Sequence, residues 1–370
     1  MRISRSETLL LDIPLPRKQK RAFGDFDKVN HLIVRLTTDE GLEGVGEVAA
    51  CGGPTWSEEC VETAQIVVDR YLAPGLVGQD PFRIEYLVAW MDRVVKGNRF
   101  AKAALESALF DIVGKALKVP VYTLLGGMYR DRLPVAWLLN VDDVPAAIAE
   151  AEVWLARGIT IFKLKVAEGD PEHELQAVDA IARAVQGRAR LRADANGGWD
   201  EATAARVIPR LAALGVEYIE QPVPRWNVVA MARLVRSSSI PIMADESVYT
   251  PEEALTIVRN EAAHAFCLKL AKAGGILATK KMAAIGEAAG FSCVISTMLE
   301  TSLGCAAALH FAASSRAVNL GSELLGPLFL ADDIAEEPVQ YEQGQILVPQ
   351  RPGLGVRLDE GKLHHYARRA

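Results

Sequence analysis

Charged residues close five short apolar runs in the middle of the chain. The runs end at Lys165, Asp194, Glu220, Asp245 and Lys269, so that successive charges lie 24 to 29 residues apart. A strand buried in a parallel sheet is apolar along its length, and a charge at its end therefore needs a separate reason. In a barrel of parallel strands, the carboxyl ends of the strands meet on the face that carries the active site. The spacing therefore predicts that the five side chains line one site.

The three carboxylates of this series, Asp194, Glu220 and Asp245, offer only oxygen ligands. Hard oxygen ligands suit Mg²⁺, for which Mn²⁺ is the usual substitute. Without a cation, three like charges on one rim would repel one another. We therefore expect Mg²⁺ to bind there, with positions left open for substrate oxygens.

Lys165 and Lys269 flank the carboxylates, and we expect their ammonium groups to face each other across the metal. A lysine is a useful base only when its pKa is lowered, which a nearby positive charge can achieve. Lys163 lies two residues before Lys165 on the same side of the strand and, together with the divalent cation, would disfavour the charged form of Lys165.

The composition is that of a globular protein with a sizeable core. The chain has 370 residues, of which 50% are hydrophobic and 24% charged, and its net charge is −6. Mild acidity without a concentrated basic run argues against nucleic acid or an anionic membrane as the main partner. No apolar run has the length of a membrane span, and the N-terminus lacks the pattern of a signal peptide.

The cysteines are typical of a reducing compartment. They are five in number, and Cys51 and Cys60 do not have the spacing of zinc ligands. The six histidines are scattered along the chain, which also argues against a zinc site. We therefore expect a cytoplasmic protein with reduced thiols that acts on a small molecule.

From about Leu133, short apolar runs alternate with amphipathic stretches, which predicts parallel βα units. The predicted strands are residues 134–139, 161–165, 189–193, 216–219, 240–244, 265–269, 292–296 and 317–320. The clearest helical patterns between them are residues 171–185, 201–214, 251–261 and 276–289. Eight strands fit a (β/α)8-type barrel better than an open sheet, and no Gly-x-Gly-x-x-Gly motif follows the early strands.

The first third of the chain shows strands followed by helices, the pattern of an α+β unit. Strands are predicted at residues 3–12, 31–37 and 44–50, and helices at 57–71, 81–94 and 99–117.

These residues resemble the enolase superfamily, in its muconate lactonizing (muconate cycloisomerase) subgroup. In the barrel, the matching stretches are residues 162–165, 192–196, 219–222, 243–247, 268–269, 297–300 and 321–327. Residues 96–102 and 352–355 also match, so the resemblance covers nearly the whole chain. A lysine base paired with Mg²⁺ is a pattern of this superfamily.

The resemblance implies a (β/α)7β-type modified TIM barrel at residues 131–327 and an α+β capping domain at residues 1–130. Residues 328–370 would return to complete the cap. Two loops of the cap, at about residues 17–26 and 51–56, would close over the substrate. The first contains the basic residues Arg17, Lys18, Lys20 and Arg21, which we interpret as part of a solvated loop.

The resemblance also implies roles for individual residues. The implied metal ligands are Asp194, Glu220 and Asp245, and the implied acid/base pair is Lys165 and Lys269. Lys163 would orient the substrate carboxylate or tune Lys165, and Glu323 would be a further active-site acid. The candidates for substrate contact are Trp56, Asn196 and Glu300. Glu300 is followed by Thr301, where muconate cycloisomerases tend to carry glycine, and this departure leaves the substrate open.

The implied chemistry is proton transfer at carbon next to a carboxylate, through an enediolate stabilised by the cation and the lysines. In a cycloisomerase, the far carboxylate of the substrate adds to its double bond and Lys165 supplies the proton. We favour this outcome because residues 297–300 and 321–327 match that subgroup. We also expect a homo-oligomer.

The main alternative is a racemase or epimerase of an amino-acid derivative (an N-acyl amino acid, a proline betaine or a dipeptide), in which Lys165 and Lys269 act on opposite faces. No Asp-x-Asp follows the seventh strand to hold the amino group of a dipeptide. A metal-free Schiff-base lyase would not need the three carboxylates, and a non-catalytic barrel would be expected to lack a base or a ligand.

Overall fold

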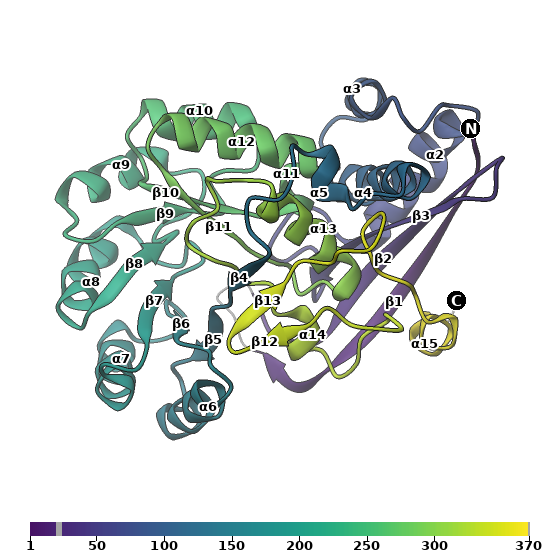
Figure 1. Cartoon of the computed structure of the whole chain (residues 1–370). Coiled ribbons are helices and arrows are strands. Elements are labelled where there is room, and N and C mark those ends of the chain that lie inside the picture. Colours follow the sequence, from purple (N-terminus) through teal and green to yellow (C-terminus); the bar gives the residue numbers. More distant parts are fainter. Residues whose placement is uncertain (20–23, 369–370) are drawn as a thin grey trace.

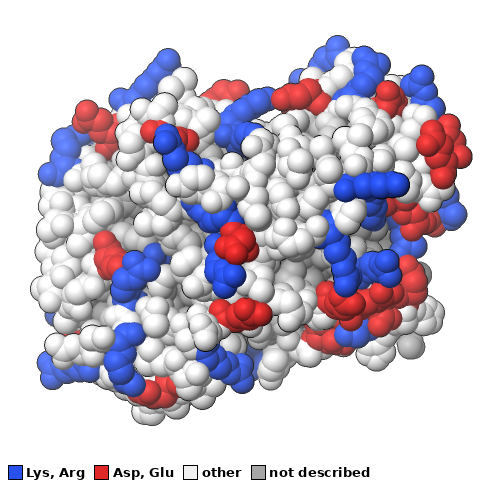
Figure 2. All heavy atoms as spheres, in the orientation of Figure 1, with Lys and Arg blue, Asp and Glu red and all other residues white. Residues whose placement is uncertain are grey.

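A barrel of parallel strands and an antiparallel sheet with its own helices make up the molecule (Figure 1). The computed structural model describes residues 1–19 and 24–368. Within these residues no helix has the length and apolar character to cross a membrane. Acidic and basic side chains are interspersed on the face shown in Figure 2.

The antiparallel sheet has the order β1-β2-β3, with β1 at Ile3–Gln19, β2 at Phe26–Thr38 and β3 at Glu43–Cys51. The first strand is longer than the predicted 3–12 because its pairing with β2 runs from Ile3 opposite Thr38 to Gln19 opposite Phe26. The predicted loop at 17–26 therefore shrinks at both ends, and its residues 20–23 lie outside the described residues.

Helices follow this sheet in the N-terminal domain. They are α1 (Val61–Val67), the π-helix η1 (Val68–Leu72), α2 (Ala73–Leu76), α3 (Ile84–Val94), α4 (Arg99–Leu117) and α5 (Val121–Leu124). Of these, α1, η1 and α4 pack against the sheet. The first helix begins later than predicted because Cys60 is its N-cap residue. The Cys60 backbone N–H donates a hydrogen bond to the hydroxyl of Thr63 in the first turn. Gly46 of β3 lets α4 approach closely, since a Cβ there would lie 2.0 Å from the Ala104 carbonyl oxygen.

Seven parallel strands form the barrel sheet, in the order β11-β10-β9-β8-β7-β6-β5. They are β5 (Trp137–Asn140), β6 (Ile161–Lys165), β7 (Arg190–Asp194), β8 (Val216–Glu220), β9 (Ile242–Ala244), β10 (Ala265–Leu268) and β11 (Ser292–Ile295). The helices between and after them are α6 (Val144–Ala156), α7 (Pro171–Val185), α8 (Glu201–Ala213), α9 (Val228–Ser237), α10 (Pro251–Arg259), α11 (Leu270–Ala273), α12 (Ile276–Ala288) and α13 (Ser302–Ala313).

The ends of the barrel differ from the prediction. The expected first strand, at residues 134–139, is interrupted: its residue Pro134 ends β4 (Arg132–Pro134), and residues 137–139 belong to β5. Strand β4 joins a small sheet with β12 (Tyr341–Glu342) and β13 (Gln345–Leu347). No regular strand forms at 317–320. Instead, Ser322 makes parallel bridges to Val135 and Ile295 and so links the two edges of the seven-stranded sheet.

The end of the chain reaches back to the first strand (Figure 1). After α14 (Gly326–Phe329) and the small sheet, α15 (Glu360–Tyr366) precedes a bridge between Ala367 and Leu11 of β1. The division of the chain at residues 130 and 327 stays a prediction.

Candidate active site

The five charged residues predicted to line one site lie at neighbouring strand ends. Lys165, Asp194 and Glu220 are the last residues of β6, β7 and β8, and they are paired with one another across the sheet. Asp245 and Lys269 follow directly after β9 and β10. All five side chains are buried. The βα spacing therefore placed them correctly, although the chemical role of each stays a prediction.

The two lysines of the predicted acid/base pair contact different carboxylates. Lys165 Nζ lies 2.6 Å from Asp194 Oδ2 and donates to Asn196 Oδ1 at 2.9 Å. Lys269 Nζ lies 2.5 Å from Asp245 Oδ2. Both lysines line one pocket, so a substrate bound there would contact two separate ammonium groups.

Lys163 is enclosed by carboxylates. Its Nζ lies 2.8 Å from Glu220 Oε1, 2.8 Å from Glu323 Oε2 and 3.2 Å from Asp194 Oδ2. Burial alone would lower the pKa of Lys163, but the surrounding carboxylates raise it well above its usual value. Lys163 is therefore a fixed positive charge at the base of the site.

Lys272, on α11, belongs to the same cluster and was not predicted. Its buried Nζ donates to Asp245 Oδ1 at 2.6 Å and to the carbonyl oxygens of Asp245 and Cys267, each at 2.7 Å. The Lys-x-x-Lys spacing of Lys269 and Lys272 could have indicated this contact. If a helical turn follows the strand, residues three positions apart lie on the same side of it. The contact was missed because Lys272 lies beyond the strand end.

Carboxylate oxygens remain unused in this buried region. Glu220 Oε2, Glu246 Oε2 and Glu323 Oε1 have no hydrogen-bond partner among the described residues. Burial raises the pKa of Glu220 well above its usual value; Lys163 opposes the shift, and the charges of Asp194 and Glu323 increase it. Buried anionic oxygens without partners are costly, so the donor set fits a bound cation.

One ligand atom each of Glu220, Cys267 and Glu323 lie within 4.8 Å of one another, the one such group in the described part of the chain. The other predicted ligands, Asp194 and Asp245, are not part of this group, and their carboxylates contact Lys165, Lys269 and Lys272. The set Asp194, Glu220 and Asp245 therefore stays a prediction.

Trp56 forms a wall of the pocket. Its indole Nε1 donates to Glu246 Oε1 at 3.0 Å, and its ring stacks on Tyr249 with centroids 5.6 Å apart. Lys269 Nζ lies 4.2 Å from the centroid of the indole ring. Asn196 Nδ2 also donates to Glu246 Oε1, at 2.9 Å. Trp56 and Asn196, both predicted substrate contacts, are therefore joined through Glu246, which the prediction did not include.

Glu300 is placed differently from the prediction. Its buried carboxylate accepts hydrogen bonds from Thr297 Oγ1 and, at 2.8 Å, from the Met298 backbone N–H. Residues 297–299 line the pocket, whereas Glu300 does not. The reason is local: a buried carboxylate takes the nearest N–H and O–H donors. Glu300 therefore shapes the wall of the pocket from behind.

Two family models match the chain. The model described as the mandelate racemase / muconate lactonizing enzyme N-terminal domain matches residues 7–126. The model described as enolase C-terminal domain-like matches residues 146–362.

Curated relatives match over nearly their full lengths. A chloromuconate cycloisomerase from Cupriavidus necator is 41% identical over 371 residues, which cover 100% of both chains. Muconate cycloisomerase 1 from Rhodococcus opacus is 41% identical over 354 residues, 95% of each chain.

Solved structures are equally similar. A muconate lactonizing enzyme from Pseudomonas fluorescens complexed with muconolactone has a TM-score of 0.97 at 41% identity, with 99% of each chain covered. The muconate lactonizing enzyme from Pseudomonas putida has a TM-score of 0.95 at 39% identity, with 100% of each chain covered.

Proposed function

Because the chain belongs to the mandelate racemase / muconate lactonizing enzyme family, we propose that it is a muconate-type cycloisomerase that closes a lactone ring. The observation that carries this proposal is full-length similarity, at about 40% identity, to muconate and chloromuconate cycloisomerases. The substrate is then a muconate, a small unsaturated dicarboxylate, or its chlorinated form. The racemase or epimerase reading has no comparable support among these relatives.

The family depends on a divalent metal ion, which we assign as Mg²⁺ held by Asp194, Glu220 and Asp245. The unused Glu220 oxygen and the crowded buried carboxylates support a cation at this position. When bound, Mg²⁺ would stabilise the negative charge that develops on the substrate carboxylate.

Each of the three lysines has its own role in this proposal. Lys165, held by Asp194 and Asn196, supplies the proton to carbon after the far carboxylate has added to the double bond. Lys269 adds positive charge beside the enediolate. Lys163 orients the substrate carboxylate, with Glu323 beside it. Trp56 excludes water from the side of the cap.

The test is an assay of muconate and chloromuconates with Mg²⁺ in D₂O, followed by NMR. We expect a lactone that carries one deuterium at the newly protonated carbon. N-acyl amino acids and proline betaines serve as the comparison panel. Deuterium exchange at the α-carbon of one of these, without lactone formation from any muconate, would support the racemase instead.

We also propose that the protein is a cytoplasmic homo-oligomer. Its five cysteines are buried, and an odd number of cysteines in a chain of this size supports reduced thiols. Sedimentation of the purified protein measures the oligomeric state.

A further inference from the structure

A carboxylate of the N-terminal domain caps a helix of the barrel. Glu106 lies on α4 and is fully buried. It accepts hydrogen bonds from the backbone N–H groups of Ile276 and, at 3.2 Å, of Leu277. These residues form the first turn of α12, whose N–H groups have no partner within the helix. The contact joins residues about 170 positions apart in the sequence.

The charged neighbours of Glu106 do not explain its burial. Burial raises the pKa of Glu106 to about 8, against the opposing effect of the two N–H groups. The charged groups that influence it are Glu85 and Lys281, which are exposed and pair with each other at 3.7 Å. Burying a carboxyl group costs free energy. The contact between Glu106 and the first turn of α12 is therefore expected to have a role that offsets this cost.

The backbone opposite Glu106 is shaped to receive it. Gly275 precedes α12 with a φ of +132°, and a Cβ at this residue would lie 1.7 Å from Glu106 Oε2. Gly274 ends α11 with a φ of +90°. The N–H groups of both glycines donate to the Leu270 carbonyl oxygen, which closes α11. The turn between α11 and α12 is therefore packed directly against the Glu106 carboxylate.

The same short segment carries two lysines of the site. Lys269 is the N-cap residue of α11, and Lys272 lies within this four-residue helix. Both ammonium groups contact Asp245, at 2.5 and 2.6 Å. Helices α11 and α4 pack against each other. A shift of the turn at Gly275 would therefore move α11 and the lysines with it.

We propose that Glu106 is a positioning residue that fixes the α11–α12 turn and thereby holds Lys269 and Lys272 against Asp245. The proposal rests on the proposed function only in giving Lys269 a part in the reaction.

The main variant is Glu106→Gln, which keeps the shape but places an NH₂ group against one of the two N–H donors. We expect kcat for muconate cyclisation to fall about tenfold with KM nearly unchanged, since small misplacements of a reacting group carry losses of this order. The matched control is Asp111→Asn. Asp111 is equally buried on α4 but contacts Val45, Leu354 and Lys115 instead. We expect it to lower stability and leave kcat within about twofold.

A double-mutant cycle shows whether Glu106 acts through Lys269. In a Lys269→Arg background, Glu106→Gln should cost less than about twofold in kcat. An equal loss in both backgrounds, an equal loss in Asp111→Asn, or no loss at all in Glu106→Gln would overturn the proposal. If Glu106→Gln does not fold, Glu106→Asp, which shortens the side chain and keeps the carboxyl group, takes its place in every arm.

A measurement without substrate separates this proposal from the proposed function. The rate at which an amine-reactive reagent modifies Lys269 is followed by mass spectrometry of the peptide. We expect Glu106→Gln to raise this rate at least roughly threefold and Asp111→Asn to leave it unchanged, because a loosened turn opens more often. If the wild type cyclises no muconate, the proposed function fails while this comparison still decides the role of Glu106. Equal labelling rates in all three proteins would contradict it.

Discussion

At the scale of single residues, the site consists of buried lysines in contact with buried carboxylates. Lys165 pairs with Asp194, and Lys269 pairs with Asp245, so each lysine has its own counter-charge. Lys163 also contacts Asp194, together with Glu220 and Glu323. Because Lys165 and Lys269 do not share a carboxylate, the loss of one should leave the position of the other intact.

Replacing Lys165 by alanine tests its assignment as the proton donor. We expect Lys165→Ala to lower the rate of cyclisation at least roughly a hundredfold, the usual scale for a general acid or base. The protein should remain folded, because Asp194 still contacts Lys163. Lys28→Ala, a change at a half-exposed lysine paired with Asp12, is the control and should keep its activity. Activity within a few-fold of the wild type in Lys165→Ala would assign the proton to another group.

Removal of the metal tests the donor set as a whole. We expect EDTA to abolish turnover, and added Mg²⁺ or Mn²⁺ to restore it, because the buried carboxylates need a cation to hold substrate oxygens. Isothermal titration of Mn²⁺ into the chelated protein gives the affinity without an assay. Full activity after exhaustive chelation would remove the metal from the reaction.

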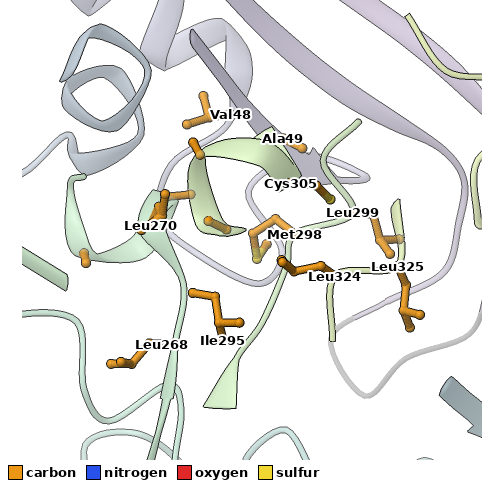
Figure 3. Close-up of a cluster of buried hydrophobic side chains, with 14 of the residues drawn as sticks. Val48, Ala49, Leu268, Leu270, Ile295, Met298, Leu299, Cys305, Leu324 and Leu325 are labelled. Carbon is orange, nitrogen blue, oxygen red and sulfur yellow. The ribbon is translucent and has the colours of Figure 1, made fainter. Parts of the chain in front are cut away.

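At the scale of elements, buried acids of the N-terminal domain accept hydrogen bonds from loops and helix ends of the barrel. Glu47 of β3 accepts hydrogen bonds from the Thr301 N–H at 2.9 Å, the Thr301 hydroxyl at 2.7 Å and the Gly304 N–H at 2.7 Å. These donors begin α13, just after the pocket wall. Figure 3 shows Val48 and Ala49 of β3 in one apolar cluster with Met298 and Leu299. The cap and the barrel therefore share a core at the pocket.

The variant Glu47→Gln measures how much these hydrogen bonds contribute to the stability of the protein. Burial alone would raise the pKa of Glu47, but the His31 ring, 2.7 Å away, lowers it below its usual value, so the group is a carboxylate. An amide cannot accept all of these hydrogen bonds, and we expect a loss of about 1–3 kcal/mol in the free energy of unfolding. Urea denaturation measures it, with Glu43→Gln at an exposed position of the same strand as control. Equal midpoints for the two variants would contradict the prediction.

At the scale of the whole molecule, distant segments meet around α13. His310 of this helix accepts from the Tyr122 N–H through Nδ1, at 3.3 Å, so its Nε2 donates to the Leu354 carbonyl oxygen at 3.1 Å. The ring therefore joins the end of the N-terminal domain, the barrel and the C-terminal segment while it is neutral. Burial lowers the pKa of His310 to about 4.

The neutral state of His310 predicts acid sensitivity. The unfolded chain binds a proton at this residue below about pH 6.5, and the folded protein does so only near pH 4, so stability should fall as pH decreases through this window. The full loss is roughly 3 kcal/mol. Urea denaturation between pH 4 and pH 7 should show a shallower decline for His310→Gln than for the wild type or for His364→Gln at an exposed position. Parallel curves for all three proteins would rule out His310 as the cause.

The sequence by itself determined the strand ends and their charges. The βα spacing and the apolar character of buried strands are local properties, so Lys165, Asp194 and Glu220 could be assigned to neighbouring strand ends from the order of residues alone. The bounds of α4 could be predicted for the same reason, because the pattern of apolar residues over its 19 positions is a property of the local sequence.

Only the tertiary structure decided which distant groups meet. The contact of Lys272 with Asp245 and the capping of α12 by Glu106 depend on the packing of separate elements. The same holds for the eighth barrel element, where a predicted strand is reduced to the bridges of Ser322. Propensity and spacing describe neighbours along the chain, whereas a buried polar group is satisfied by whichever donor the fold brings within about 3 Å of it.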